Sequence, residues 1–384
     1  MKRNLRMKKP IIKCILLVLL LIAAPGAKSG FAKAAPSISS NYYCLIDGET
    51  AQVLWGKNQD EKRPVASTTK IMTALLAVEY ADLDEIAVVS RNAQLTPEYA
   101  IDLREGQTLA IGELVKIALL RSANDAAVVL AEHITGDERL FAHLMSKKAC
   151  ILGAYNTHFE NSSGLPSASG YSSAYDMALI SRLALRDVYI AQMVSTAKDS
   201  FQHPSYRQPL TITNTNSLLT TFPGADGIKT GTTNAAGRCL AASATRDQRQ
   251  LIAVCLRSGQ RFGDCARLLE YGFTSFEPAL VLDQHQPFKT VKLPEYQLHI
   301  DLFPDRNLNL WYDGEQPDII REVVMDYAFE LPVQKGEPLG RVLIYAGGRH
   351  IDSVNLVSGQ TVKRTAVNQW LKRWFKGKNE ALAE

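Results

Sequence analysis

Residues 64–70 read Pro64-Val65-Ala66-Ser67-Thr68-Thr69-Lys70, and they lead into an amphipathic segment that is predicted to be a helix over Thr69–Tyr80. Ser67 and Lys70 stand three residues apart, so they share one face of this helix near its positive end. A serine hydroxyl is a poor nucleophile until a base removes its proton, and a lysine amine serves as that base only when it is held neutral. The stretch therefore predicts a serine nucleophile with its own lysine base.

Two further motifs follow in order along the chain, Ser122-Ala123-Asn124 and Lys229-Thr230-Gly231. The short patterns are weak alone, because Ser-x-x-Lys recurs at 195–198 and Ser-x-Asn recurs at 39–41, 90–92 and 353–355. Lys-Thr-Gly occurs once, and Ser195 follows an apolar segment without opening a helix of its own. Context favours one ordered set that begins at Ser67.

The third motif is expected to supply positive charge and to bind the substrate. Lys229, expected on a strand, supplies positive charge that lowers the pKa of Lys70 and attracts an anionic substrate group, and Thr230 adds a hydroxyl donor. A tetrahedral intermediate also needs donors for its oxyanion, and the backbone N–H groups of Ser67 and Thr232 are the expected pair.

The second motif lies between helices expected over Ile111–Leu120 and Ala123–His133. A turn there aims the Ser122 hydroxyl and the Asn124 amide into a cleft. The hydroxyl is a candidate to pass a proton between the base and a leaving nitrogen. The alternative is that it caps the second helix, and the two roles are compatible.

Other catalytic schemes find little support in the sequence. The seven histidines are scattered, and the patterns H-E-x-x-H and G-x-S-x-G are absent. We therefore expect neither a metal site nor a Ser-His-Asp triad, and no cofactor.

Residues 1–34 differ from the rest of the 384-residue chain. Basic residues precede the apolar run Cys14–Ala24, and Ala32-Lys33-Ala34 offers small residues for cleavage, which predicts a secretory signal; an uncleaved membrane anchor is the alternative. These residues hold eight Lys and Arg and no acid, so the formal charge without them is 35 minus 39, or −4. No basic patch for nucleic acid remains to be explained.

Five cysteines stay in the mature chain, an odd number without C-x-x-C spacing: Cys44, Cys150, Cys239, Cys255 and Cys265. Several lie in apolar runs. Buried free thiols are therefore favoured over a disulfide framework.

Patterns along the chain predict an α/β fold followed by a small all-β domain. Hairpins expected over 42–55 and 238–257 flank helical patterns, so the terminal strands are expected to share one antiparallel sheet beside a helical subdomain. Short alternating stretches follow Phe276. The expected domains are a signal at 1–34, a catalytic domain at 35–277, a β domain at 278–360 and an amphipathic tail at 361–384.

The tail pairs an aromatic face with basic residues elsewhere around the helix, namely Val367, Trp370, Leu371, Trp374 and Phe375 against Lys363, Arg364, Lys372, Arg373, Lys376 and Lys378. A helix packed on the β domain and a helix lying on a membrane surface both fit this pattern.

Four longer blocks accompany the motifs, at 120–127, 161–166, 171–178 and 226–231. With them the chain resembles the low-molecular-mass penicillin-binding proteins, a family of serine-type D-alanyl-D-alanine carboxypeptidases that trim cell-wall peptides. The resemblance covers nearly the whole length. It implies the penicillin-binding/β-lactamase-like transpeptidase fold, with the cleft between helical subdomain and sheet.

The resemblance also implies roles for matching residues. Ser67 becomes the acylated nucleophile and Lys70 its base, Ser122 relays a proton with support from Asn124, and Lys229 with Thr230 holds the substrate carboxylate. Gly231 completes the third motif. Arg261, in Gly-Gln-Arg-Phe, matches an arginine that holds the terminal carboxylate in relatives, with a solvated surface residue as the alternative.

Two positions depart from the family pattern. Many relatives have His where this chain has Gly170, and some have His in place of Thr232, which would alter substrate preference without touching the nucleophile or base.

The implied reaction is removal of the terminal D-alanine from peptidoglycan stem peptides, with β-lactam antibiotics as covalent inhibitors. A β-lactamase is one alternative, although no E-x-x-L-N segment lies between Asn124 and Lys229. A catalytically silent cell-wall-binding protein is another. The expected location is outside the cytoplasm, on the outer face of the cytoplasmic membrane.

Overall fold

The computed structural model describes residues 35–293, 298–314, 318–326 and 331–363. The predicted signal lies outside the described residues, and so does the tail from residue 364. In the described part no helix is both long enough and apolar enough to cross a bilayer.

A five-stranded antiparallel sheet joins the two ends of the first part of the chain, in the order β2-β1-β9-β8-β7. Its strands are β1 (Tyr42–Asp47), β2 (Val53–Lys57), β7 (Ala225–Thr233), β8 (Gly237–Arg246) and β9 (Arg249–Leu256). The N-terminal hairpin pairs with β9, which confirms the prediction that the terminal strands share a sheet. The strand β7, which carries Lys-Thr-Gly, lies at one edge.

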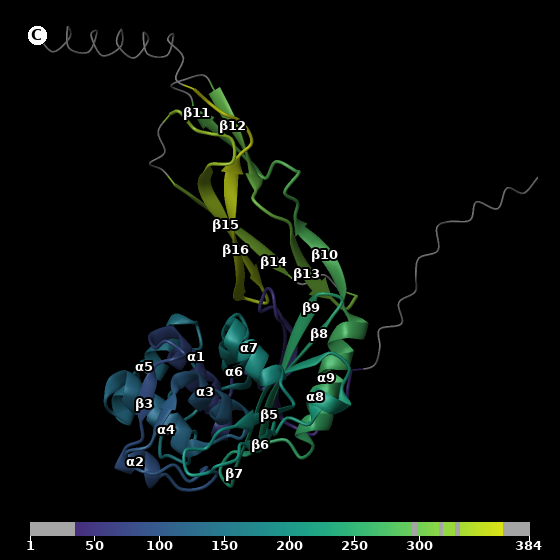
Figure 1. The fold of residues 1–384 in the computed structure, drawn as a ribbon. Helices are drawn as coiled ribbons and strands as arrows, with labels where there is room; N and C mark the ends of the chain where they lie inside the picture. The colour runs from purple at the N-terminus through teal and green to yellow at the C-terminus, as the bar shows by residue number, and fades with distance from the viewer. Residues whose placement is uncertain (1–34, 294–297, 315–317, 327–330, 364–384) are drawn as a thin grey trace, which may run out of the picture. The chain divides into compact units, whose positions relative to one another are not determined.

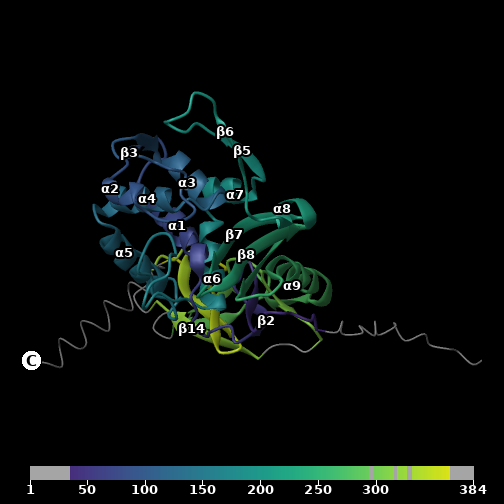
Figure 2. The ribbon, with the colours of Figure 1, turned by 90° about the horizontal axis from the view of Figure 1, so that it is seen from below.

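Both faces of this sheet are buried, because consecutive side chains of the central strands are apolar and point to opposite faces. Cys44, Ile252 and Val254 belong to one hydrophobic cluster, with α1 and its neighbouring helices. Leu45 and Ala253 belong to the cluster on the opposite face, with α9 (Arg261–Ser275). Figures 1 and 2 show the helical group and α9 on opposite sides of the sheet.

The helical group contains α1 (Lys70–Tyr80), α3 (Ile111–Leu120), α4 (Asn124–Thr135), α5 (Glu138–Ile151) and α6 (Ala174–Ala184). Three of them, α1, α3 and α4, match the helices that we predicted over 69–80, 111–120 and 123–133, with ends that agree within two residues. Local chemistry sets several ends: Gly136 ends α4 in the left-handed conformation, and Asp137 caps α5 by accepting from the N–H of Arg139 and Leu140.

Smaller elements complete this part: α2 (Arg91–Gln94), α7 (Val188–Ser195), α8 (Leu218–Thr221), and the strand pairs β3 (Ile86–Val88) with β4 (Thr108–Ala110) and β5 (Lys198–Phe201) with β6 (Leu210–Thr213).

The later residues form two further antiparallel sheets around their own hydrophobic core. One pairs β10 (Glu277–Leu282) with β13 (Leu308–Tyr312), and the other has the order β11-β12-β16-β15-β14. Its strands are β11 (Lys289–Leu293), β12 (Leu298–Pro304), β14 (Ile319–Met325), β15 (Pro338–Ala346) and β16 (Arg349–Ser358). An all-β region after Phe276 is thereby confirmed.

The cysteine prediction is correct for four of five thiols. All five are free, and Cys44, Cys239, Cys255 and Cys265 are buried. Cys150 is exposed, because it lies in the last turn of α5 on the face that points away from the core.

Candidate active site

Ser67 lies in a short 3-10 helix, η1 (Ala66–Thr69), that runs directly into α1. Ala66 adopts a left-handed conformation with φ 50°, and a Cβ at Gly164 would lie 2.0 Å from the carbonyl oxygen of Ala66. Only a glycine allows so close an approach. The turn around residue 164 therefore braces the segment that presents Ser67.

The strand β7 braces the same segment from the other side. A Cβ at Gly231 would lie 2.9 Å from the backbone nitrogen of Ser67. Glycine at this position lets the β7 backbone pass beside the Ser67 amide. The first and third motifs thus meet through backbone contact.

Lys70 is fully buried at the start of α1, and three oxygens surround its amine. Lys70 Nζ lies 3.1 Å from Ser67 Oγ, and it donates to Asn124 Oδ1 and to the Ser163 carbonyl oxygen, each at 2.6 Å. Burial, and then the charge of Lys229, lower the pKa of Lys70 well below the ordinary value. This lysine has the surroundings of a neutral amine.

Asn124 connects Lys70 to the neighbouring loop. Its Oδ1 accepts from Lys70, while its Nδ2 donates to the carbonyl oxygens of Pro97 and Glu98 at 3.2 and 3.0 Å. Its backbone N–H donates to the Tyr99 carbonyl oxygen. One side chain at the start of α4 therefore fixes both Lys70 and residues 97–99.

Ser122 does not cap a helix, so that part of the prediction is wrong. The N-cap of α4 is Ala123, without a side-chain capping bond, and Ser122 adopts a left-handed conformation with φ 67°. Left-handed serines are uncommon and mark positions that the surrounding structure holds in place. Ser122 and Ser67 line one cavity.

Lys229 and Thr230 lie on β7, as expected. Burial, and then the Arg261 guanidinium, lower the pKa of Lys229 to about 7. The hydroxyl of Thr230 lies 2.7 Å from that of Thr215. Thr215 was not predicted, because a threonine in a connecting segment carries no sequence signal of its own.

Arg261 is the first residue of α9 and reaches back to β7. Its Nη1 donates to the Gly231 carbonyl oxygen at 2.9 Å and to Thr232 Oγ1 at 2.8 Å. These contacts place the guanidinium beside the third motif rather than on an isolated surface.

Four of the motif residues line one cavity of about 100 Å³, which we call the site cavity, while Lys70, Asn124 and Lys229 are buried outside its lining. It is lined by Ser67, Tyr99, Ser122, Thr215, Thr230, Gly231, Thr232 and Arg261. Sequence analysis did not anticipate Tyr99. The repeated Ser-x-x-Lys pattern does not contribute, since Ser195 ends α7, Lys198 begins β5, and the Ser195 hydroxyl donates to the Gln192 carbonyl oxygen.

No group of three or more His, Cys, Asp or Glu side chains in the described ranges is arranged to hold a metal ion. The groups in and beside the site cavity are a buried amine, hydroxyls, backbone amides and two further basic side chains.

Comparisons with known proteins agree with this geometry. Residues 29–259 match a family model described as D-alanyl-D-alanine carboxypeptidase. The carboxypeptidase DacF of Bacillus subtilis is 31% identical, over 96% of this chain and 98% of that protein. DacA of Escherichia coli is 31% identical over 85% of this chain and 84% of that protein. The solved structure of penicillin-binding protein 5 from Haemophilus influenzae has a TM-score of 0.69 and 27% identity, over 86% of this chain and 99% of that one.

Proposed function

Because the chain belongs to the D-alanyl-D-alanine carboxypeptidase family, and is a serine-type peptidase, we propose that Ser67 is its nucleophile, Lys70 its general base and Ser122 its proton relay. The enzyme removes the terminal D-alanine from peptidoglycan stem peptides. The proposal concerns which residues carry this reaction.

The observation that carries the proposal is the environment of Lys70. A neutral amine has two N–H groups and one lone pair. Asn124 Oδ1 and the Ser163 carbonyl oxygen accept the two N–H groups. The lone pair is then free to accept the proton of the Ser67 hydroxyl, whose oxygen lies 3.1 Å from Lys70 Nζ. Acyl transfer by a serine needs a base in this position.

Acylation then proceeds in balanced steps. Ser67 Oγ attacks the carbonyl carbon of the penultimate D-alanine as its proton passes to Lys70, and the backbone N–H groups of Ser67 and Thr232 hold the oxyanion. The Ser122 hydroxyl, with Asn124 in support, passes a proton on to the leaving nitrogen as the C–N bond breaks. Water attacks the ester in the second half, which releases the acid and restores Ser67.

Three residues in or beside the site cavity suit the terminal carboxylate. Lys229 and Arg261 supply positive charge, and Thr230 supplies a hydroxyl donor. Arg261 already contacts Gly231 and Thr232, so its guanidinium is held in place before substrate arrives. Pre-ordering of this kind lowers the entropy cost of binding.

The same site explains the family's reaction with β-lactams. We expect these antibiotics to acylate Ser67 and the resulting acyl-enzyme to hydrolyse slowly. The reason is that the chain has no E-x-x-L-N loop to activate a deacylating water. Rapid steady-state turnover of a penicillin by the mature enzyme would favour a β-lactamase instead.

We further propose that residues 35–277 form the catalytic domain of an exported protein, residues 278–360 a β domain, and residues 361–384 an attachment to the outer face of the cytoplasmic membrane. The basic and apolar pattern of residues 1–34 supports export, and the aromatic and basic pattern of the tail supports attachment.

Release of D-alanine from a diacyl-D-Ala-D-Ala peptide tests the assignment of the nucleophile. Ser67→Ala should lower kcat by about 10⁴-fold or more, since the covalent route is lost. Ser195→Ala is the matched control, because it removes a hydroxyl from the other Ser-x-x-Lys sequence. Equal release by wild type and Ser67→Ala would show the assignment to be wrong.

A further inference from the structure

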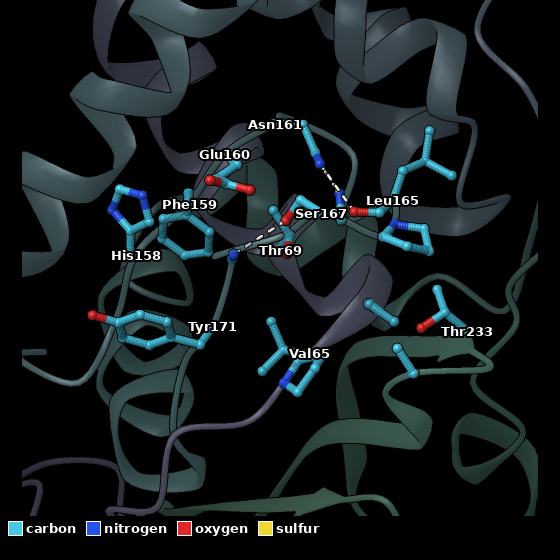
Figure 3. Close-up of a pocket in the computed structure, with 16 residues that line it drawn as sticks. Val65, Thr69, His158, Phe159, Glu160, Asn161, Leu165, Ser167, Tyr171 and Thr233 are labelled. Atoms are coloured by element: carbon cyan, nitrogen blue, oxygen red, sulfur yellow. Dashed lines mark hydrogen bonds between the residues drawn. The ribbon is translucent and has the colours of Figure 1, made fainter.

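A second, narrow pocket of about 50 Å³ lies next to the site cavity (Figure 3). We call it the side pocket. It is formed by the segment 158–171, by residues 64–66 with Thr69, and by Thr233 and Ala235 after the third motif. Figure 3 shows Thr233 at one side and His158 with Tyr171 at the other.

The side pocket begins where the site cavity ends. Ala66 lines the side pocket, and the next residue, Ser67, lines the site cavity. Likewise Thr233 lines the side pocket and Thr232 lines the site cavity. A substrate whose terminal carboxylate lies at Arg261 and whose scissile carbonyl lies at Ser67 must extend its remaining residues past Ala66 and Thr233. The residue before the two D-alanines is thus the one whose side chain can enter the side pocket.

The edge position of β7 supports this path. A strand at the edge of a sheet presents unpaired N–H and C=O groups, to which an extended peptide can add as a further strand. Alternate side chains of the added peptide then point to opposite sides. The side pocket offers room on one of these sides.

The walls of the side pocket are largely apolar, from Val65, Leu165 and Pro166, and one carboxylate, that of Glu160, lies among them. Glu160 Oε2 accepts from the Ser169 N–H at 3.1 Å. This bond and the hydroxyls of Ser169 and Ser167 lower the pKa of Glu160, so the carboxylate is ionised at neutral pH.

Few cations compete for this carboxylate. Among the described residues no Lys or Arg forms an ion pair with Glu160. His158 lines the same pocket, and the Lys62 ammonium lies 4.7 Å from the ring centroid of Tyr171. Figure 3 shows His158 on the side of Glu160 that lies away from Thr233, so His158 does not stand between the carboxylate and Thr233.

Resting on the proposed function, we propose that the side pocket takes the side chain that precedes D-Ala-D-Ala, and that it selects a long aliphatic chain ending in an ammonium group. Apolar walls suit the methylenes, and Glu160 suits the charge. An amine that has been acylated keeps the methylenes but loses the charge, so the enzyme should distinguish free from acylated amines.

Two probe peptides isolate the charge: Nα-acetyl-L-Lys-D-Ala-D-Ala, with a free side-chain amine, and Nα,Nε-diacetyl-L-Lys-D-Ala-D-Ala, without one. We expect kcat/KM for D-alanine release to be roughly fivefold higher for the free amine, in line with one partly exposed ion pair. The preference should shrink in high salt. Equal kcat/KM for both peptides would overturn the proposal, whereas release from neither would contradict the proposed function.

Glu160→Gln keeps the acceptor for the Ser169 N–H and removes the charge. It should abolish the preference while kcat/KM for the diacetyl peptide stays near the wild-type value, which also shows that the fold is intact. Glu61→Gln is the matched control, because Glu61 is exposed, neighbours Lys62 and lies outside the lining of the side pocket. If Glu160→Gln kept the preference, or Glu61→Gln lost it equally, the side pocket would not be the selecting site.

Discussion

The proposed mechanism requires opposite charge states on two buried lysines, Lys70 and Lys229. Lys70 must be neutral to accept a proton, and Lys229 must be protonated to attract a carboxylate. Burial lowers the pKa of both, but the charge of Lys229 lowers that of Lys70 further. A protonated Lys229 therefore favours the neutral form of Lys70, which assigns the two roles.

This assignment predicts a bell-shaped dependence of kcat/KM on pH in the free enzyme. Activity rises with pH as Lys70 loses its proton, because only the neutral amine is a base. It falls again above about pH 7 as Lys229, whose pKa is about 7, loses the charge that attracts the substrate. Initial rates on a diacyl-D-Ala-D-Ala peptide at low substrate concentration give the profile.

An acyl-D-Ala ester without a terminal carboxylate serves as the control, and its profile should lack the falling limb. Arg261→Gln should move that limb to higher pH for the peptide, because the Arg261 charge contributes to the lowered pKa of Lys229. A falling limb that is the same for both substrates would separate Lys229 from carboxylate binding.

The first turn of α4 positions the loop that follows α2 as well as Lys70. Asp125 Oδ2 accepts from the N–H groups of Ile101 and Leu103 at 3.0 and 3.2 Å, and Asn124 holds the carbonyls of Pro97 and Glu98. Glu98, Tyr99 and Asp102 all have left-handed backbones in this loop. Their conformations persist because the two neighbouring residues of α4 hold the loop from both sides.

Asp125→Ala should therefore release the loop. Two buried or half-buried N–H groups lose their acceptor, which costs about 2 kcal/mol of unfolding free energy. Because Tyr99 lines the site cavity, kcat/KM should also fall while the Ser67–Lys70 pair stays intact. Chemical denaturation and hydrogen exchange of residues 97–103 measure the two effects.

Asp125→Asn keeps one acceptor oxygen and should lie between wild type and Asp125→Ala. Unchanged hydrogen exchange in residues 97–103 of the alanine variant would mean that Asn124 alone holds the loop.

Local signals predicted the elements with strong periodicity and missed those that depend on distant partners. The helix α9 was not expected, because Gly263 and Gly272 weaken its helical propensity. Gly272 is buried and a Cβ there would lie 2.6 Å from Leu251, so contact with the sheet explains this glycine. The apolar spacing of Cys265, Leu268 and Leu269 was the signal that could have revealed the helix.

The three motifs could be found in the sequence because each suggests a chemical use, whereas the residues that support them could not. Ser163 provides a backbone carbonyl to Lys70, and any residue type could do so. Tyr99 reaches the site cavity through a left-handed loop, which the sequence pattern does not specify. The capping role for Ser122 failed because helix boundaries are uncertain by a residue or two from sequence.

At the scale of the whole molecule, charge is divided unevenly along the chain. Residues 361–384 hold six Lys and Arg and two Glu. The mature chain has 35 basic and 39 acidic residues, so residues 35–360 hold 29 and 37, a net charge of −8. An anionic membrane surface therefore repels the body and attracts the tail, at about 1 kcal/mol for each basic residue close to the surface.

Removal of residues 364–384 should free the mature enzyme from anionic membranes and leave peptide hydrolysis intact. The deletion begins after Val362, because Val362 is buried and its backbone pairs with Val333. Co-sedimentation with vesicles of phosphatidylglycerol and phosphatidylcholine measures binding, and D-alanine release measures activity. Replacing the six basic residues of the tail with Gln separates charge from aromatic insertion, since only the charge contribution weakens in high salt. If the deleted enzyme still sedimented with these vesicles, another part of the protein would provide the attachment; if it lost activity, the tail would be a packed element of the fold.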